Sequence, residues 1–188
     1  NVTVRPLADG GEGTTDALIE GLGGRKVELS VTGPMGSWVK AYYGILADEK
    51  TVVMEMAQAA GITLVEEAQR NPGKATTYGV GEMIRDAVSR GYRKFIIGIG
   101  GSATNDGGIG MLRALGVKFL TKDGEEAGEG ADALGKIHFV SLEHLMPELK
   151  ECDFQIACDV TNPLCGEKGA TYIYGKQKGI REEEMPRI

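Results

Sequence analysis

Glycines and polar side chains gather in clusters along the sequence, and their residue types suit the binding of an anion or a sugar acid. The first cluster runs from Asp9 to Thr14 and has glycines at 10, 11 and 13 around Glu12. The second, residues 98–108, holds five glycines together with two hydroxyls, an amide and a carboxylate. Glycine lets backbone N–H groups approach a ligand closely, so such loops favour phosphoryl or polyhydroxy ligands.

A third cluster, residues 157–163, follows an apolar run and contains Asp159 and Asn162. Open α/β sheets bind ligands beyond the carboxyl ends of their strands, which is where Asp159 is expected. A carboxylate there can accept a proton from a substrate hydroxyl or hold a magnesium ion. An Asx turn that closes the strand explains the same residues without catalysis, and both interpretations stay open.

Two other phosphate-binding patterns are present in part. Residues 98–103 fit the looser dinucleotide fingerprint G-x-G-x-x-A, with Asp123 about twenty residues later, which leaves a Rossmann-type NAD-binding oxidoreductase domain as an alternative. That fingerprint needs a helix to begin within the motif, whereas residues 104–108 extend the loop. Residues 130–136 match the P-loop pattern up to its last position, where Ile137 replaces the serine or threonine that holds magnesium.

Composition excludes several classes of protein. The 188 residues carry a net charge of −6, which argues against binding to nucleic acid or to an anionic membrane. A hydrophobic fraction of 41% excludes a disordered chain, and no apolar run approaches the ~20 residues of a membrane span. Three cysteines match no zinc pattern and predict reduced thiols in a cytoplasmic protein.

Alternating patterns of strand and helix must position the clusters. A helix is predicted over 14–22, and another over 77–90 from apolar residues at a 3.6 period. The run 94–99 does not alternate, which predicts a parallel strand buried on both faces. Three strands are predicted to form an antiparallel meander, and further short elements follow. The meander covers 26–31, 39–46 and 51–56; the other strands are 2–7, 117–120, 137–140 and 154–160, with a short helix ending at 115, a loop over 123–135 and a helical turn over 142–149.

In their order along the chain, these motifs resemble the successive signatures of the bacterial class I glycerate kinases. The matching blocks are 8–14, 31–34, 98–108, 157–164 and 175–179, so the resemblance covers essentially the whole sequence. It implies transfer of the γ-phosphoryl group of ATP, with Mg²⁺, to a hydroxyl of D-glycerate. The sequence departs from the family at Lys176, where the family often has proline. It also lacks the further motifs that the family has before Asn1 and after Ile188. The sequence is therefore expected to be an inactive fragment.

The resemblance also implies an α/β fold of two lobes around a cleft. Residues 1–25 are expected to belong to a flavodoxin-like lobe with a parallel sheet, and 26–75 to form the β-meander of a second, restriction-endonuclease-like lobe with a mixed sheet. Residues 76–188 form an α/β segment that carries the glycine-rich loop and the Cys-Asp-Val-Thr-Asn-Pro turn. A homodimer is left open, and no nucleic acid or membrane is expected as a partner.

Roles for single residues follow from the same resemblance. Asp159 is expected near the attacking hydroxyl, with Asn105 as a second catalytic residue, and Asp106 is expected to reach magnesium. The residues expected to hold substrate or phosphate are Asp9, Gly10, Gly11, Glu12, Gly100, Gly101, Ser102, Thr104 and Asn162, with Gly100 and Gly101 acting through their amides. A noncatalytic sugar-acid-binding domain would keep these loops and need no magnesium, so it remains an alternative.

Overall fold

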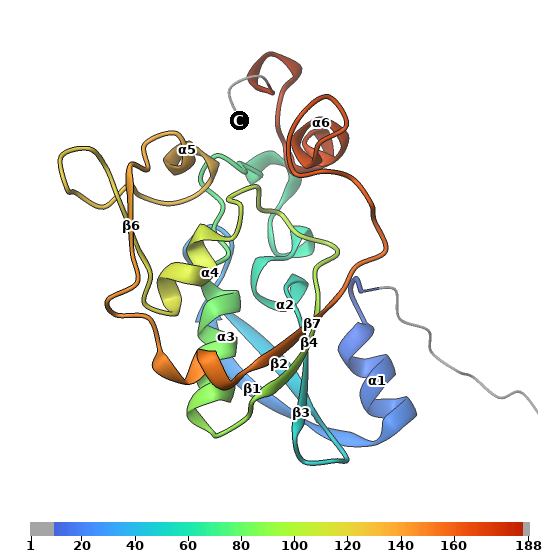
Figure 1. Ribbon diagram of the computed structural model, residues 1–188. Coiled ribbons are helices and arrows are strands. Elements are labelled where there is room, and N and C mark those ends of the chain that lie inside the picture. The colour runs from blue at the N-terminus through green and yellow to red at the C-terminus, as the bar shows by residue number, and fades with distance from the viewer. Residues whose placement is uncertain (1–9, 186–188) are drawn as a thin grey trace, which may run out of the picture.

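A mixed five-stranded sheet forms the centre of the molecule (Figure 1). The structure, a computed structural model, describes residues 10–185, so the predicted strand 2–7 and Asp9 lie outside the described residues. The strand order is β1-β2-β3-β4-β7. The meander is β1 (Gly24–Thr32), β2 (Trp38–Leu46) and β3 (Thr51–Glu55), and β4 (Lys94–Gly98) and β7 (Asp153–Ala157) continue the sheet parallel to β3. The predicted α/β class with a mixed sheet is confirmed.

Helices cover both faces of this sheet, and β2 shows how. Tyr43 is fully buried and donates a hydrogen bond of 2.7 Å to Asp86 of α3 (Tyr78–Ser89). The next residue, Gly44, points the opposite way, toward α1 (Thr14–Leu22), where an added Cβ would lie 2.7 Å from Ile19. Successive strand residues alternate between faces, so the sheet lies between α3 and α1 (Figure 1).

The apolar face of α3 confirms the helix predicted over 77–90. Its inward residues are spaced at three and four, all are buried, and they form most of the helical side of the main core. Burying each of the larger ones contributes about 1.5–3 kcal/mol to stability. These residues are Val80, Met83, Ile84, Ala87 and Val88.

A second, smaller core lies beside the sheet. It is built around α4 (Ile109–Ala114) and an antiparallel pair, β5 (Lys118–Leu120) and β6 (Phe139–Ser141). The stretch 123–135, predicted as loop, contains the one-turn helix α5 (Ala131–Leu134). The reason is local: Gly130 has φ +68 and starts the turn, and Ala133 is buried in this core.

Short helices complete the chain. The helical turn predicted over 142–149 begins later than expected, as the 3₁₀ helix η3 (Pro147–Glu151). No helix within residues 10–185 is long and apolar enough to span a membrane. The division into lobes stays a prediction, because the sheet takes strands from both 26–75 and 76–188. The other short elements are α2 (Ala57–Ala60), η1 (Ile62–Leu64), η2 (Glu67–Gln69), α6 (Ala170–Tyr174), η4 (Lys176–Lys178) and η5 (Glu182–Glu184).

Candidate functional site

The glycine-rich clusters meet at the carboxyl ends of β4 and β7. The amide of Gly100 donates to the carbonyl of Gly10 at 2.9 Å, and that of Ile99 donates to Ala157 at 3.4 Å. A Cβ added at Gly98 would lie 2.5 Å from the Gly10 oxygen, and one added at Gly10 would lie 2.5 Å from the Ala157 oxygen. Glycine at 10 and 98 is therefore required for backbone packing, and this packing brings the first cluster against the other two.

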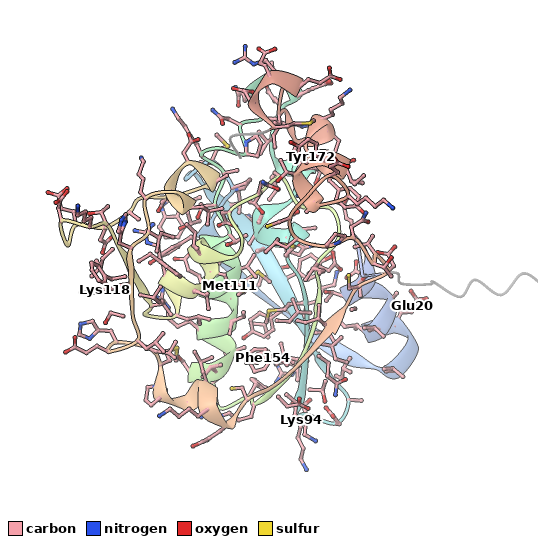
Figure 2. The ribbon with its side chains drawn as sticks, turned by 45° about the horizontal axis from the view of Figure 1, so that its top comes forward. Glu20, Lys94, Met111, Lys118, Phe154 and Tyr172 are labelled. Carbon is pink, nitrogen blue, oxygen red and sulfur yellow. The ribbon has the colours of Figure 1, made fainter. Side chains whose placement is uncertain are left out.

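This end of the sheet is overlaid by the last part of the described chain. Figure 2 shows Lys94, the first residue of β4, and Tyr172, on α6, at opposite ends of the molecule. The loop 98–108 therefore leaves β4 on the side of α6, as ligand loops of α/β sheets do.

The carboxylate of Glu55 binds the beginning of α1. It is the last residue of β3, it is fully buried, and its carboxylate accepts hydrogen bonds from the amides of Gly13 at 3.1 Å and Thr15 at 2.5 Å. A helix N-terminus has unsatisfied N–H donors and a partial positive charge, so a carboxylate is a favourable partner. Glu55 was not among the predicted site residues, although an acid that ends an otherwise apolar strand is a signal for such a role. The amide of Gly13 in the first cluster and that of Thr15 just after it are thus already bound to a carboxylate of the protein.

Replacing Glu55 by alanine is expected to lower the free energy of unfolding by on the order of 3 kcal/mol, because the buried amide of Thr15 and the part-buried amide of Gly13 lose a charged acceptor. Urea denaturation followed by circular dichroism measures the change. The matched control is Glu12→Ala, an exposed acid on the same turn, which should stay within about 0.5 kcal/mol of the wild type. Equal stability of both variants would contradict the assigned role.

Asp106 anchors the far end of the loop. It is 1% exposed, and its carboxylate accepts hydrogen bonds from the amide and hydroxyl of Thr77 (2.9 and 2.8 Å), from the amide of Gly110 (3.2 Å) and from that of Gly108 (3.0 Å). The carboxylate therefore joins the start of α3 to the start of α4. Because α4 begins at Ile109, after the fingerprint residues 98–103, the turn lacks the helix placement of a dinucleotide site.

These donors already occupy both oxygens of Asp106, so its role as a magnesium ligand stays a prediction. Among residues 10–185, no group of three or more histidine, cysteine, aspartate or glutamate side chains is placed to hold a metal ion. The amide of Gly100, expected to hold a ligand, instead donates to Gly10. An added Cβ at Gly100 would lie 2.8 Å from Gly11, so this glycine serves the packing of the two loops.

The middle of the loop is held by the segment 170–180. Lys178 Nζ donates to the hydroxyl of Ser102 at 2.9 Å and to the carbonyl of Thr104 at 2.7 Å. Asn105 donates through its side-chain amide to the hydroxyl of Thr171 at 2.9 Å. Burial lowers the pKa of Lys178 to about 8, although the negative charge of Asp106 acts to raise it. Lys178 lies within the matching block 175–179 but was not among the predicted site residues.

The strand before the third cluster ends earlier than predicted. The strand expected over 154–160 ends at Ala157, because its partner β4 ends at Gly98, which pairs with Ala157. Asp159 is exposed, and no hydrogen bond or ion pair joins its carboxylate to another residue of 10–185. Asn162 is engaged, since it accepts from the hydroxyl of Tyr174 at 2.7 Å and donates to the carbonyl of Lys168 at 3.2 Å.

Several known proteins similar to this chain are named as glycerate kinases. The model of the "Glycerate kinase family" matches residues 1–188. The chain is 46% identical over 183 residues to the glycerate kinase of Haemophilus influenzae, covering 97% of this chain and 48% of that protein. It is 48% identical over 177 residues to the glycerate 2-kinase of Escherichia coli, covering 94% and 46%. The chain thus spans about half the length of the curated relatives it matches.

A solved structure agrees with these relatives. It is the crystal structure of a protein from Salmonella typhimurium LT2, provisionally assigned as glycerate kinase 2. It matches 97% of this chain, and 49% of its own, with a TM-score of 0.93 and 46% sequence identity.

Proposed function

The chain belongs to the glycerate kinase family, and from this premise we propose that the whole protein transfers the γ-phosphoryl group of ATP to a hydroxyl of D-glycerate. The observation that carries the proposal is the family match over the entire sequence, including the loop 98–108. In this loop the amides of Gly101, Ser102, Thr104 and Asn105 donate to no acceptor within residues 10–185.

The amides and hydroxyls of the loop give it its proposed role. Ser102 and Thr104 add hydroxyls to the amides, and Gly101 makes the bend with φ +71. Such donors suit the oxygens of a phosphoryl group or of a sugar acid. Gly10, Gly11 and Glu12 would line the neighbouring wall, since their turn packs against this loop.

Asp159 is the proposed proton acceptor. Phosphoryl transfer needs little covalent chemistry from the protein, so catalysis depends on positioning the substrates and neutralising charge. The Asp159 carboxylate is exposed and has no partner in the described chain, so its oxygens are available to a substrate hydroxyl. Asn105, held by Thr171, would orient the reacting groups, and Asn162 would fix the turn that carries Asp159.

Magnesium belongs to the proposed reaction, where it neutralises charge on the phosphates. The carboxylates at this end of the described sheet differ in their fit to the ion. Those of Glu55 and Asp106 are filled by backbone and hydroxyl donors, whereas Glu12 and Asp159 are exposed. Because Asp159 is proposed to take the substrate proton, Glu12 is the residue among these that could hold the ion without losing a hydrogen bond.

A coupled assay of ADP release by the whole protein tests the proposal. We expect ADP release to require D-glycerate and Mg²⁺ together. The control substrate is D-lactate, which lacks one hydroxyl of D-glycerate. Titration with NADH, followed by cofactor fluorescence, should show no binding. Binding of NADH would favour the oxidoreductase alternative. Glycerate affinity that is unaffected by ATP and Mg²⁺, without ADP release, would favour a noncatalytic binding domain.

A further inference from the structure

We infer that Lys178 binds an oxyanion of the ligand, a phosphate or a carboxylate, at the glycine-rich loop. The inference rests on the proposed function only for the identity of that ligand. Lys178 lies at the end of η4, so it would bring a positive charge from a different part of the chain to the loop amides.

The hydrogen bonds of Lys178 are incomplete. The residue is 9% exposed, and its ammonium group, which carries three N–H donors, uses two of them for Ser102 and Thr104. No acceptor within residues 10–185 takes the third. No carboxylate of the described chain lies within the 4.0 Å of an ion pair, whereas Lys176, two residues earlier, is exposed and paired with Glu182.

Burial of an unpaired ammonium is costly, so its persistence requires an explanation. Asp106 is the carboxylate whose charge acts on Lys178, but its two oxygens already accept hydrogen bonds from the starts of α3 and α4. A ligand oxyanion would supply the missing partner. The position fits, because Nζ is bonded to Ser102 and Thr104, two of the loop residues whose amides lack an acceptor.

Arg70 provides a second, independent observation. It contacts the chain on both sides of Lys178: its Nη1 donates to the carbonyl of Gln177 at 3.2 Å, and its backbone packs against Gly179. Its Nε is buried without an acceptor in the described residues, and none of their carboxylates pairs with it. Two basic side chains therefore lie along one short segment with unused donors.

The competing interpretation is that Lys178 only fastens η4 to the loop. Lys178→Met removes the charge at similar length, Lys178→Arg keeps it, and Lys176→Met is the matched control for charge loss in the same segment. Calorimetric titration of the whole protein with inorganic phosphate, ATP and D-glycerate measures affinity. We expect Lys178→Met to weaken at least one probe by about tenfold or more, Lys178→Arg to retain part of the affinity and Lys176→Met to match the wild type.

The probes distinguish the source of the oxyanion. Weaker phosphate and ATP binding would assign a phosphoryl group to Lys178, and weaker glycerate binding alone would assign a carboxylate. A bound anion raises the pKa of Lys178, so binding to the wild type at pH 8.5 should take up a fraction of a proton, detected by titration in two buffers of different ionisation enthalpy. The charged groups that face or flank Lys178 are Asp106 and Arg70.

Affinities within twofold of the wild type for a folded Lys178→Met would overturn the inference. If that variant does not fold, absence of proton uptake by the wild type overturns it equally. Failure of the proposed function gives a different result, since binding without ADP release leaves the assignment of Lys178 intact.

Discussion

Replacing Asp159 by asparagine in the whole protein is expected to lower kcat for D-glycerate by about 10²- to 10³-fold with little change in KM. The carboxylate lies just beyond the end of β7, exposed and without a partner in the described residues, so its oxygens are available to take a proton from substrate. Asparagine has nearly the same shape but cannot accept that proton, so the loss falls on the transition state.

Asp153→Asn is the matched control for this experiment. Asp153 is an exposed aspartate at the opposite end of the same strand, and its replacement should leave both kinetic constants unchanged. Steady-state ADP release measures both variants. Turnover by Asp159→Asn close to that of the wild type would remove Asp159 from the mechanism and leave it as the closing residue of a turn.

A polypeptide limited to these 188 residues is expected to show no measurable turnover of D-glycerate. The described residues supply the loop 98–108 and the turn 10–13, but the segment 158–168 that carries Asp159 is exposed throughout. Phosphoryl transfer requires two substrates held in line, and a displacement of about 1 Å already costs roughly 10²-fold in rate. The relatives matched by this chain are about twice as long as the part it covers.

The apolar surface on β7 supports the same expectation. β7 is an edge strand of the described sheet, and Ile156 and Leu164 are 53% and 72% exposed on and after it. Exposed apolar side chains along an unpaired strand edge are typical of a surface that other protein covers. The test compares ADP release by the 188-residue polypeptide, shown to be folded by circular dichroism, with that of the whole protein. Activity within tenfold of the latter would contradict the prediction.

Local patterns predicted much of the fold. The helix over 14–22 has the predicted bounds, because glycines precede and follow a short apolar period. The meander was predicted correctly because turns at 33–36 and 48–50 separate three β-rich runs. α2 and α6 were not predicted, since four or five residues are too few for a 3.6 period to be detected.

The parts of the site that could not be predicted depend on contacts between distant residues. The sequence marks Gly10 and Gly98 as loop residues, but their direct packing follows only from the placement of β4 beside β7. Glu55 and Lys178 reach partners 40 and 76 residues away, and no spacing along the chain indicates such pairs. The residues that were predicted are those inside the clusters, and those that were missed hold the clusters in place.

The hydrogen bonds of Asp106 determine which side of the site can rearrange. The loop is fixed at Gly98 by the sheet and at Asp106 by the starts of two helices, so its shape exists before any ligand arrives. A loop that is already ordered loses little conformational entropy on binding, which otherwise costs about 0.5–1.5 kcal/mol for each immobilised side chain. Residues 158–168 are exposed and have few such ties. Any conformational entropy lost on ligand binding at this site therefore falls mainly on that segment rather than on the loop.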